Sequence, residues 1–123
     1  MAEIKIPGTN HPITVGKNPD RVVVKAGDQV IADTRDALSL QEASYPAVQY
    51  IPRQDVDLTL LERTGHHTYC PYKGKASYYS VLPAGAAGVN AVWTYEHPYK
   101  AVADIREYLA FYPDKVSIEI IAD

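Results

Sequence analysis

Apolar and polar residues alternate with a period of two in short segments along the chain, whereas an apolar period near 3.6 is weak everywhere. The segments RVVVKA and QVIADT flank Gly27-Asp28 and predict a β-hairpin. Further alternating segments, separated by turn residues, are ALSLQE, AVQYI, ASYYSV, AVWTY, EYLAFY and VSIEII. We expect the last two to pair across Pro113-Asp114. The pattern therefore predicts a mainly β, antiparallel fold.

Two segments have the best claim to helix. One runs from Arg53 to Glu62, with Asp55 as a candidate N-cap and Thr64-Gly65 after its end. The other runs from Tyr99 to Ile105. Between them, the small-residue stretch LPAGAAGVN predicts a loop that is long enough to cover a pocket. We therefore expect one or two short helices in addition to the strands.

The length of 123 residues suits one domain with one core. Residues 1–11 have little apolar pattern and contain Pro7-Gly8, so we interpret them as an N-terminal arm. Residues 12–123 are then a single β domain. Ten tyrosines against one Phe and one Trp predict a partly polar interior, because each buried hydroxyl needs a hydrogen-bond partner. The alternative is that most tyrosines lie half exposed on sheet faces.

Charge and composition narrow the classes of partner. The net charge of −3 has no basic field, which argues against nucleic-acid binding. No apolar run approaches the ~20 residues of a membrane span, and the N-terminus lacks the apolar stretch of a signal peptide, so we expect a cytoplasmic protein with no membrane partner. A single cysteine excludes an internal disulfide and a cysteine-rich zinc site. The sequence indicates no cofactor and no metal.

The stretch TYCPYKGKASYYS, residues 68–80, is the clearest candidate for a site. Pro71 and Gly74 predict a tight turn between two strands, and Gly74 permits a positive φ there. Cys70 is a candidate nucleophile only if a histidine activates it. In an extended strand His67 points to the opposite face and His66 lies ~13 Å away, which favours a packed or pocket-lining thiol.

Alternation places Glu42 on the same face as the apolar residues of its strand, so the carboxylate is expected to point inward and to need a cation. If the strand ends at Gln41, Glu42 is instead solvated. Lys73 beside Gly74 is a candidate anion-binding cation, although no Walker motif accompanies it. Asp55 and Asp57 could clamp Mg²⁺ only from an extended backbone, because i and i+2 diverge on a helix.

The segments YIPRQDVD, TYCPYKGKASYYSV, VWTYEHP and YLAFYPDKV resemble the bacterial domain of unknown function 427, and the resemblance covers nearly the whole chain from Arg21. It implies a compact, barrel-like antiparallel β fold. A nucleotidyltransferase-like label is sometimes attached to this family, but the Gly-Ser and paired-aspartate pattern of such enzymes does not occur here. The family pattern falls on Glu42, Tyr50, Pro52, Asp55, Cys70, Pro71, Lys73, Gly74, Tyr79, Trp93, Tyr95, Pro98 and Phe111.

From these features we predict a domain that binds a small polar or anionic molecule in a pocket built around the CPYKG turn. The pocket is expected to contain Glu42, Arg53, Cys70, Lys73 and Tyr79, under a roof formed by residues 83–90. The alternative is a protein-interaction module that uses a tyrosine-rich face. A concave, partly buried cluster favours the first, and a flat exposed patch the second. The sequence leaves open whether a reaction is catalysed and whether the chain forms a homo-oligomer.

Overall fold

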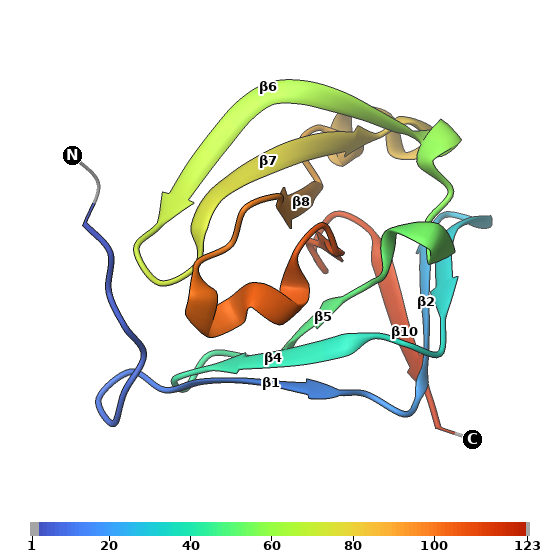
Figure 1. Ribbon diagram of the computed structural model, residues 1–123. Helices are drawn as coiled ribbons and strands as arrows, with labels where there is room; N and C mark the ends of the chain where they lie inside the picture. The colour runs from blue at the N-terminus through green and yellow to red at the C-terminus, as the bar shows by residue number, and fades with distance from the viewer. Residues whose placement is uncertain (1–2, 123) are drawn as a thin grey trace.

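The computed structural model describes residues 3–122 and confirms a mainly β fold (Figure 1). The strands are β1 (Ile13–Lys17), β2 (Arg21–Ala26), β3 (Gln29–Thr34), β4 (Leu38–Glu42), β5 (Val48–Tyr50), β6 (Leu61–Cys70), β7 (Gly74–Val81), β8 (Val92–Tyr95), β9 (Leu109–Phe111) and β10 (Ser117–Ile121). Four 3₁₀ segments lie between them within the described residues: η1 (Arg53–Asp55), η2 (Leu58–Leu60), η3 (Leu82–Gly88) and η4 (Lys100–Ile105).

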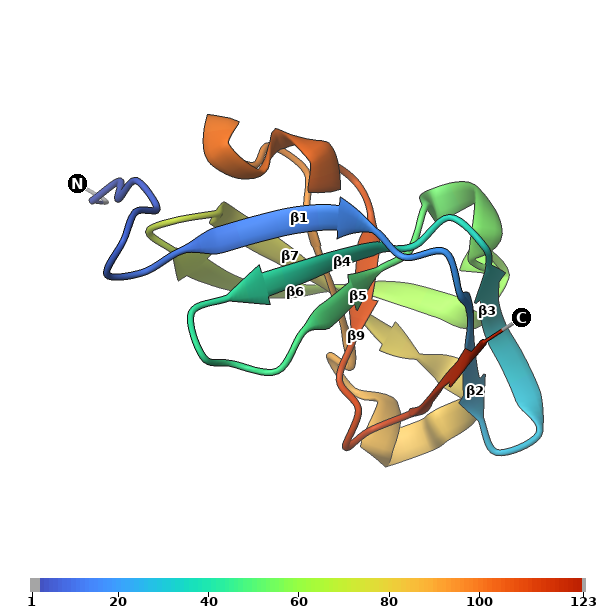
Figure 2. The same cartoon turned by 90° about the horizontal axis from the view of Figure 1, so that it is seen from below.

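The strands of residues 3–122 form three antiparallel sheets, in the orders β1-β4-β5, β10-β2-β3 and β6-β7-β8-β9. Figure 1 shows β6 to β8 above β1 and β4, with β2 and β10 upright beside them, and Figure 2 shows the same sheets from below. The first and third sheets meet at one bridge, where Ile51 and Leu109 exchange two backbone hydrogen bonds of 2.8 Å. Because this junction is a single bridge, the sheets do not close into a barrel.

The predicted hairpin around Gly27-Asp28 is confirmed as β2 and β3, and Gly27 adopts a φ of 60°. The predicted pairing of the last two strands is wrong. β9 pairs with β8, whereas β10 pairs with β2 in the register Ile118↔Val24. The physical reason lies in the connection, where the backbone N–H groups of Lys115 and Val116 both donate to Tyr112 O and turn the chain away from β9.

The helix predicted from Arg53 to Glu62 is also wrong. Only η1 and η2 form, and β6 already begins at Leu61. Val56 interrupts the helix because it bridges Ala32 of β3. The predicted N-cap is displaced as well, since it is Asp57 that accepts from Thr59 N at 3.1 Å. The second predicted helix, Tyr99 to Ile105, is present as η4, and the predicted loop after Val81 is largely η3.

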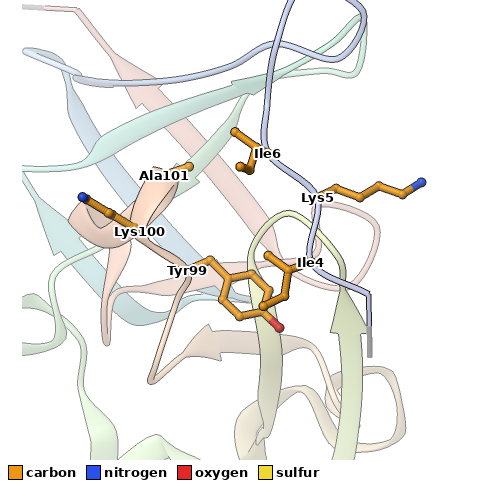
Figure 3. A pocket seen from close by; sticks show the side chains of 6 residues that line it. All are labelled: Ile4, Lys5, Ile6, Tyr99, Lys100 and Ala101. Carbon is orange, nitrogen blue, oxygen red and sulfur yellow. The ribbon is translucent and has the colours of Figure 1, made fainter. Parts of the chain in front are cut away.

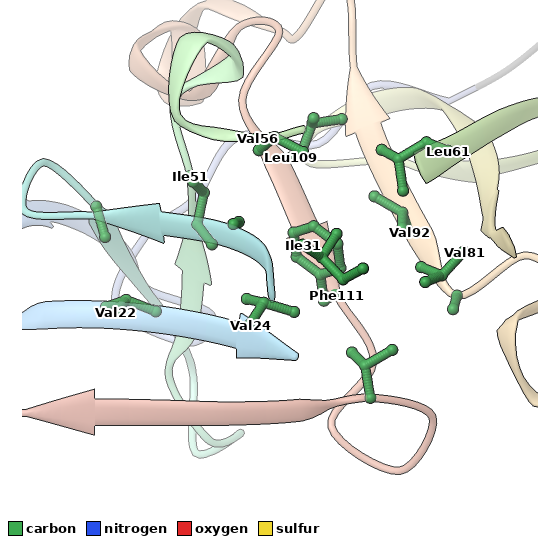
Figure 4. Close-up of a cluster of buried hydrophobic side chains, with 14 residues drawn as sticks. Val22, Val24, Ile31, Ile51, Val56, Leu61, Val81, Val92, Leu109 and Phe111 are labelled. Atoms are coloured by element: carbon green, nitrogen blue, oxygen red, sulfur yellow. The ribbon is translucent and has the colours of Figure 1, made fainter. Parts of the chain in front are cut away.

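Two clusters of buried side chains hold the sheets together. The first is mainly aliphatic and lies between β2, β3 and the β6–β9 sheet, with Val24, Ile31, Val81 and Leu109 each at most 1% exposed (Figure 4). The second, which we call the tyrosine layer, lies between β4, β5, β7, β8 and η4. Its buried members are Leu40, Tyr50, Ala76, Tyr78, Tyr95, Val102, Ile105 and Ala110. The predicted polar interior is therefore present on one side of the β6–β9 sheet.

The arm, residues 3–11, runs beside the β6–β7 turn in the structure (Figure 1). Lys5 N donates to Pro71 O at 2.8 Å, and Tyr69 Oη donates to Glu3 O at 2.6 Å. His11 is half-buried and reaches Glu42. Part of the arm thus completes the surroundings of the CPYKG turn. None of the helices in residues 3–122 is both long and apolar enough to cross a membrane.

Candidate functional site

The CPYKG segment forms the tight turn between β6 and β7. Lys73 N donates to Cys70 O at 3.2 Å and closes the turn, with Pro71 at its second position where a fixed φ is favourable. Gly74 follows with a φ of 109°, which a side chain would make costly. Tyr99 N donates to Lys73 O at 3.0 Å and ties the turn to the start of η4. The backbone therefore fixes where Lys73 begins and which way it points.

Glu42 and Lys73 form an ion pair at the end of β4. Lys73 Nζ lies 2.5 Å from Glu42 Oε1, and the two side chains are 12% and 17% exposed. His11 Nε2 donates to the other carboxylate oxygen at 2.7 Å, and its ring stacks on Tyr72 at 4.1 Å between centroids. Burial raises the pKa of Glu42, but the hydrogen bonds from Lys73 and His11 outweigh it and lower the pKa overall. We call this trio, His11, Glu42 and Lys73, the clasp.

Cys70 is half-buried and packs against the tyrosine layer next to the clasp. Burial raises the pKa of Tyr95 and of Tyr50, and the nearby Glu42 and Cys70 add to both shifts. Hydrogen bonds pair several of the polar groups of the layer. Trp93 Nε1 donates to Tyr50 Oη at 3.2 Å, and Tyr78 Oη lies 2.9 Å from Thr68 Oγ1. His66 packs edge-on against Tyr78 rather than against Cys70.

Arg53 and Tyr79 belong to a second group on the opposite face of the β6–β9 sheet. Arg53 Nη1 and Arg63 Nη1 lie 3.5 and 3.4 Å from Tyr79 Oη, and both guanidinium groups lie within 6 Å of the ring centroid (5.9 and 5.8 Å). Arg63 also makes two hydrogen bonds to Glu96, of 2.9 and 3.2 Å, and Ser77 Oγ donates to the same carboxylate. We call these five residues the arginine–tyrosine cluster.

The structure thus divides the five predicted residues, so the expected convergence on one pocket does not occur. Glu42, Lys73 and Cys70 lie together, whereas Arg53 and Tyr79 lie together elsewhere. Tyr79 neighbours Tyr78 on β7, and successive residues of a strand point to opposite faces. The predicted roof is misplaced too, because η3 follows β7 while Lys73 precedes it, which separates them by roughly 20–25 Å of strand.

The two aspartates considered for metal binding serve the fold. Asp55 Oδ2 accepts from Thr34 Oγ1 at 2.7 Å, and Asp57 caps η2. Both carboxylates therefore have local partners at different places in the backbone. Within residues 3–122 no group of three or more His, Cys, Asp or Glu side chains has the arrangement of a metal site.

An aromatic groove opens where the tyrosine layer reaches the surface, and sequence reasoning did not identify it. Its volume is about 400 Å³, and its walls are residues 45–49, residues 111–113, and Ile118 and Ile120 of β10, with Trp93 as a floor. The Trp93 and Tyr112 rings lie 4.6 Å apart at 46°. The only signal in the sequence was the aromatic pair itself, because β10 reaches this place only through its pairing with β2.

A larger hollow of about 630 Å³ lies between the arm and η4 (Figure 3). Ile4 and Ile6 of the arm form one side, and Tyr99 and Ala101 form the other, with Tyr99 beside Ile4. Ile4 and Ile6 are 61% and 85% exposed. Because one wall is an arm segment whose two isoleucines are largely exposed, the aromatic groove is the better-formed of the two cavities.

The pairing of Glu96 with Arg63 makes a direct prediction for titration. The hydrogen bonds from Arg63 hold the pKa of Glu96 at about 2, against an ordinary value of 4.5. Replacing Arg63 by Gln is expected to return the pKa of Glu96 toward the ordinary value. Carbon-detected NMR of the side-chain carboxyl during an acid titration measures it, with exposed Glu107 as the reference. An unchanged pKa in the variant would contradict the pairing.

The comparison with protein families agrees with the resemblance noted from the motifs. The model of the domain of unknown function 427 (DUF427) matches residues 14–122. A search of curated proteins found no match. The match includes the CPYKG turn, the tyrosine layer and the arginine–tyrosine cluster, and omits the whole arm. Since the matched region is nearly the whole chain, this protein belongs to the DUF427 family.

Proposed function

We propose that this protein is a small-molecule-binding domain and that its ligand occupies the aromatic groove. The observation that carries the proposal is a concave, apolar cavity of about 400 Å³ with an aromatic floor. Ligand pockets in proteins commonly measure 300–1,000 Å³ and are lined mainly by apolar and aromatic side chains. A cytoplasmic location, which suits the single thiol of Cys70, is part of the proposal.

The hydrogen bonds around the groove indicate what kind of ligand it suits. Trp93 Nε1 already donates to Tyr50, and Tyr112 Oη lies 3.3 Å from Tyr78 Oη. Both amide atoms of Gln49 are also engaged, with Asn18 and Ser39. These polar groups are therefore already bonded, and the remaining lining is mainly ring faces and aliphatic side chains without a charged group, which favours an uncharged, planar aromatic molecule. The sequence had suggested a polar or anionic ligand at the CPYKG turn, where Lys73 is instead paired with Glu42.

The tyrosines weigh against the alternative of a flat interaction face. Tyr50, Tyr78 and Tyr95 are at most 6% exposed, and among the described residues only Tyr45 and Tyr69 exceed 40%. These two do not share a surface, because Tyr45 lines the groove and Tyr69 packs edge-on against Tyr99 beside the arm. The tyrosine-rich surface is thus concave, which supports a small ligand over a protein partner.

The chain offers a built-in probe, because Trp93 is its single tryptophan and forms the floor of the groove. The test set consists of uncharged aromatic fragments with one or two rings, including indole analogues that do not fluoresce at the Trp band. We expect some of these fragments to change the fluorescence emission of Trp93 in a saturable way. The same fragments should raise the midpoint of thermal unfolding, since they bind only the native state.

A matched pair of variants locates the binding. Ile120 lines the groove and is 53% exposed, whereas its neighbour Ile121 does not line it and is 39% exposed. Ile120→Ala is expected to weaken fragment binding by roughly fivefold, from lost apolar contact, and Ile121→Ala to leave it unchanged. Equal effects of the two variants, or a fragment set with no saturable member, would rule out this groove as the site.

A further inference from the structure

The geometry points to a second site, separate from the aromatic groove: we propose that Arg53 and Arg63, which both reach Tyr79 Oη, bind an oxyanion, the carboxylate or phosphate group of a small molecule. Arg53 comes from η1 and Arg63 from the edge strand β6, and the two meet over Tyr79 of β7. Each approaches the same hydroxyl, at 3.5 and 3.4 Å. Two segments that follow closely in the chain thus bring two cations to one hydroxyl.

The charges of the cluster are not balanced. It holds two guanidinium groups and one carboxylate, Glu96, and that carboxylate is taken by Arg63 through two hydrogen bonds. Ser77 Oγ donates to Glu96 as well. Arg53 forms no ion pair with a carboxylate of residues 3–122, although its charge is close enough to lower the pKa of Glu96. Two like charges that approach the same hydroxyl repel, and an anion bound to both would relieve the repulsion.

The hydrogen-bond donors of Arg53 lead to the same conclusion. Its Nε is buried and has no partner within residues 3–122. The one side-chain hydrogen bond of Arg53 within the described chain, to Tyr79 Oη, is 3.5 Å long, at the limit of such bonds. A buried hydrogen-bond donor without a partner costs free energy. The guanidinium presents its N–H groups in a planar fork, and this fork matches two oxygens of a carboxylate or phosphate. Arg53 is thus a pre-placed oxyanion donor.

The position of the arginine–tyrosine cluster keeps the proposed anion site separate from the clasp and from the aromatic groove. Lys73 cannot contribute, because it is engaged in the clasp on the opposite face of the sheet. The groove has no arginine or lysine among its lining residues, whereas the cluster has Arg53. Tyr79 supplies both a hydroxyl that can donate to the anion and a ring face that holds the two guanidinium groups in place.

The test follows the side-chain Nε–H signals of the arginines by NMR during titration with inorganic phosphate and, separately, with acetate, at constant ionic strength set by chloride. We expect the Arg53 and Arg63 signals to shift saturably with one or both anions, while exposed Arg106 shifts little. The titration that saturates at the lower anion concentration identifies the ligand group: phosphate if the phosphate titration does so, and carboxylate if the acetate titration does so. Equal, unsaturated shifts at all three arginines would mean general ion screening and would overturn the site.

Two variants test the geometry rather than the charge alone. Arg53→Lys keeps the positive charge but loses the fork, and Arg53→Gln loses both. Loss of a hydrogen bond to a charged group is expected to weaken anion binding about tenfold or more in Arg53→Gln, and part of this loss should persist in Arg53→Lys. Arg106→Gln is the matched control, and the midpoint of thermal unfolding shows that each variant folds. Undiminished binding in Arg53→Gln would refute the proposal while leaving the aromatic groove untouched.

Discussion

Replacing Lys73 by Met is expected to lower the free energy of unfolding by about 2–3 kcal/mol. This value lies between the cost of removing one partner from a fully buried ion pair and the cost of removing one partner from a solvated ion pair. The reason is that Glu42 would keep its charge at 17% exposure with only His11 as a donor. Glu42→Gln should cost about the same, since it leaves the Lys73 ammonium at 12% exposure. Urea unfolding of the purified variants measures both changes.

The double variant, with both Glu42→Gln and Lys73→Met, measures the interaction energy between the two side chains separately from the effects of the single substitutions. When both charges are gone, neither partner is left buried alone, so the double variant should be more stable than the sum of the two single losses predicts, with a coupling energy of about 1–2 kcal/mol. The exposed pair Lys17 and Asp36, which are 72% and 62% exposed, is the control and should couple weakly. A coupling below about 0.3 kcal/mol for Glu42 and Lys73 would contradict a desolvated ion pair.

The pH dependence of stability provides an independent check on the clasp. The folded state holds the pKa of Glu42 below 4.5, so the unfolded state binds the proton more readily. The stabilisation that ionised Glu42 gives the folded state is therefore fully present when the pH is above 4.5, and it is lost as the pH falls through the lower pKa that Glu42 has in the folded state. The difference in stability between the wild type and Glu42→Gln should narrow over the same range. A difference that is constant down to the lowest pH would exclude Glu42 as the titrating group.

The clasp is the part of the site that the sequence predicted best. Period-two alternation put Glu42 inside, and an inward carboxylate requires a cation, which the tight turn around Gly74 supplies as Lys73. His11 escaped prediction because its partner is set by the register Ile13↔Glu42 of β1 and β4, which no local pattern specifies. Local chemistry thus identified the pair, and non-local register added the third member.

The arginine–tyrosine cluster and the aromatic groove show why other features escaped sequence reasoning. Arg53 and Tyr79 were singled out as site residues, but Arg63 was not, because it follows directly on the segment that was interpreted as helix, whereas it belongs to β6. The groove depends on β10 pairing with β2 instead of β9. Alternation identifies a strand and its buried face, yet strand partners are chosen by contacts far apart in sequence. Both missed features depend on such partners.

Replacing Gly88 by Ala is expected to destabilise the protein by about 3 kcal/mol, the upper end of the usual cost of overpacking. A Cβ atom on Gly88 would lie 2.2 Å from Val81 O and 2.9 Å from Ala84 Cβ. The first of these neighbours is backbone at the end of β7, and the Val81 side chain is fully buried in the aliphatic core. Relief of the clash therefore requires η3 to move away from β7 or the core to shift, and neither is a side-chain adjustment.

The control for this substitution is Gly16→Ala on β1, where an added Cβ meets nothing within 4 Å. That variant should be neutral or slightly more stable, because alanine reduces the freedom of the unfolded chain. For a domain of this size, the loss in Gly88→Ala corresponds to a fall of roughly 10 °C in the midpoint of thermal unfolding, which differential scanning calorimetry measures. If Gly88→Ala instead unfolds at the same temperature as Gly16→Ala, then η3 does not pack on β7 as closely as these distances require, because a carbon atom at 2.2 Å from a carbonyl oxygen cannot be accommodated without displacement.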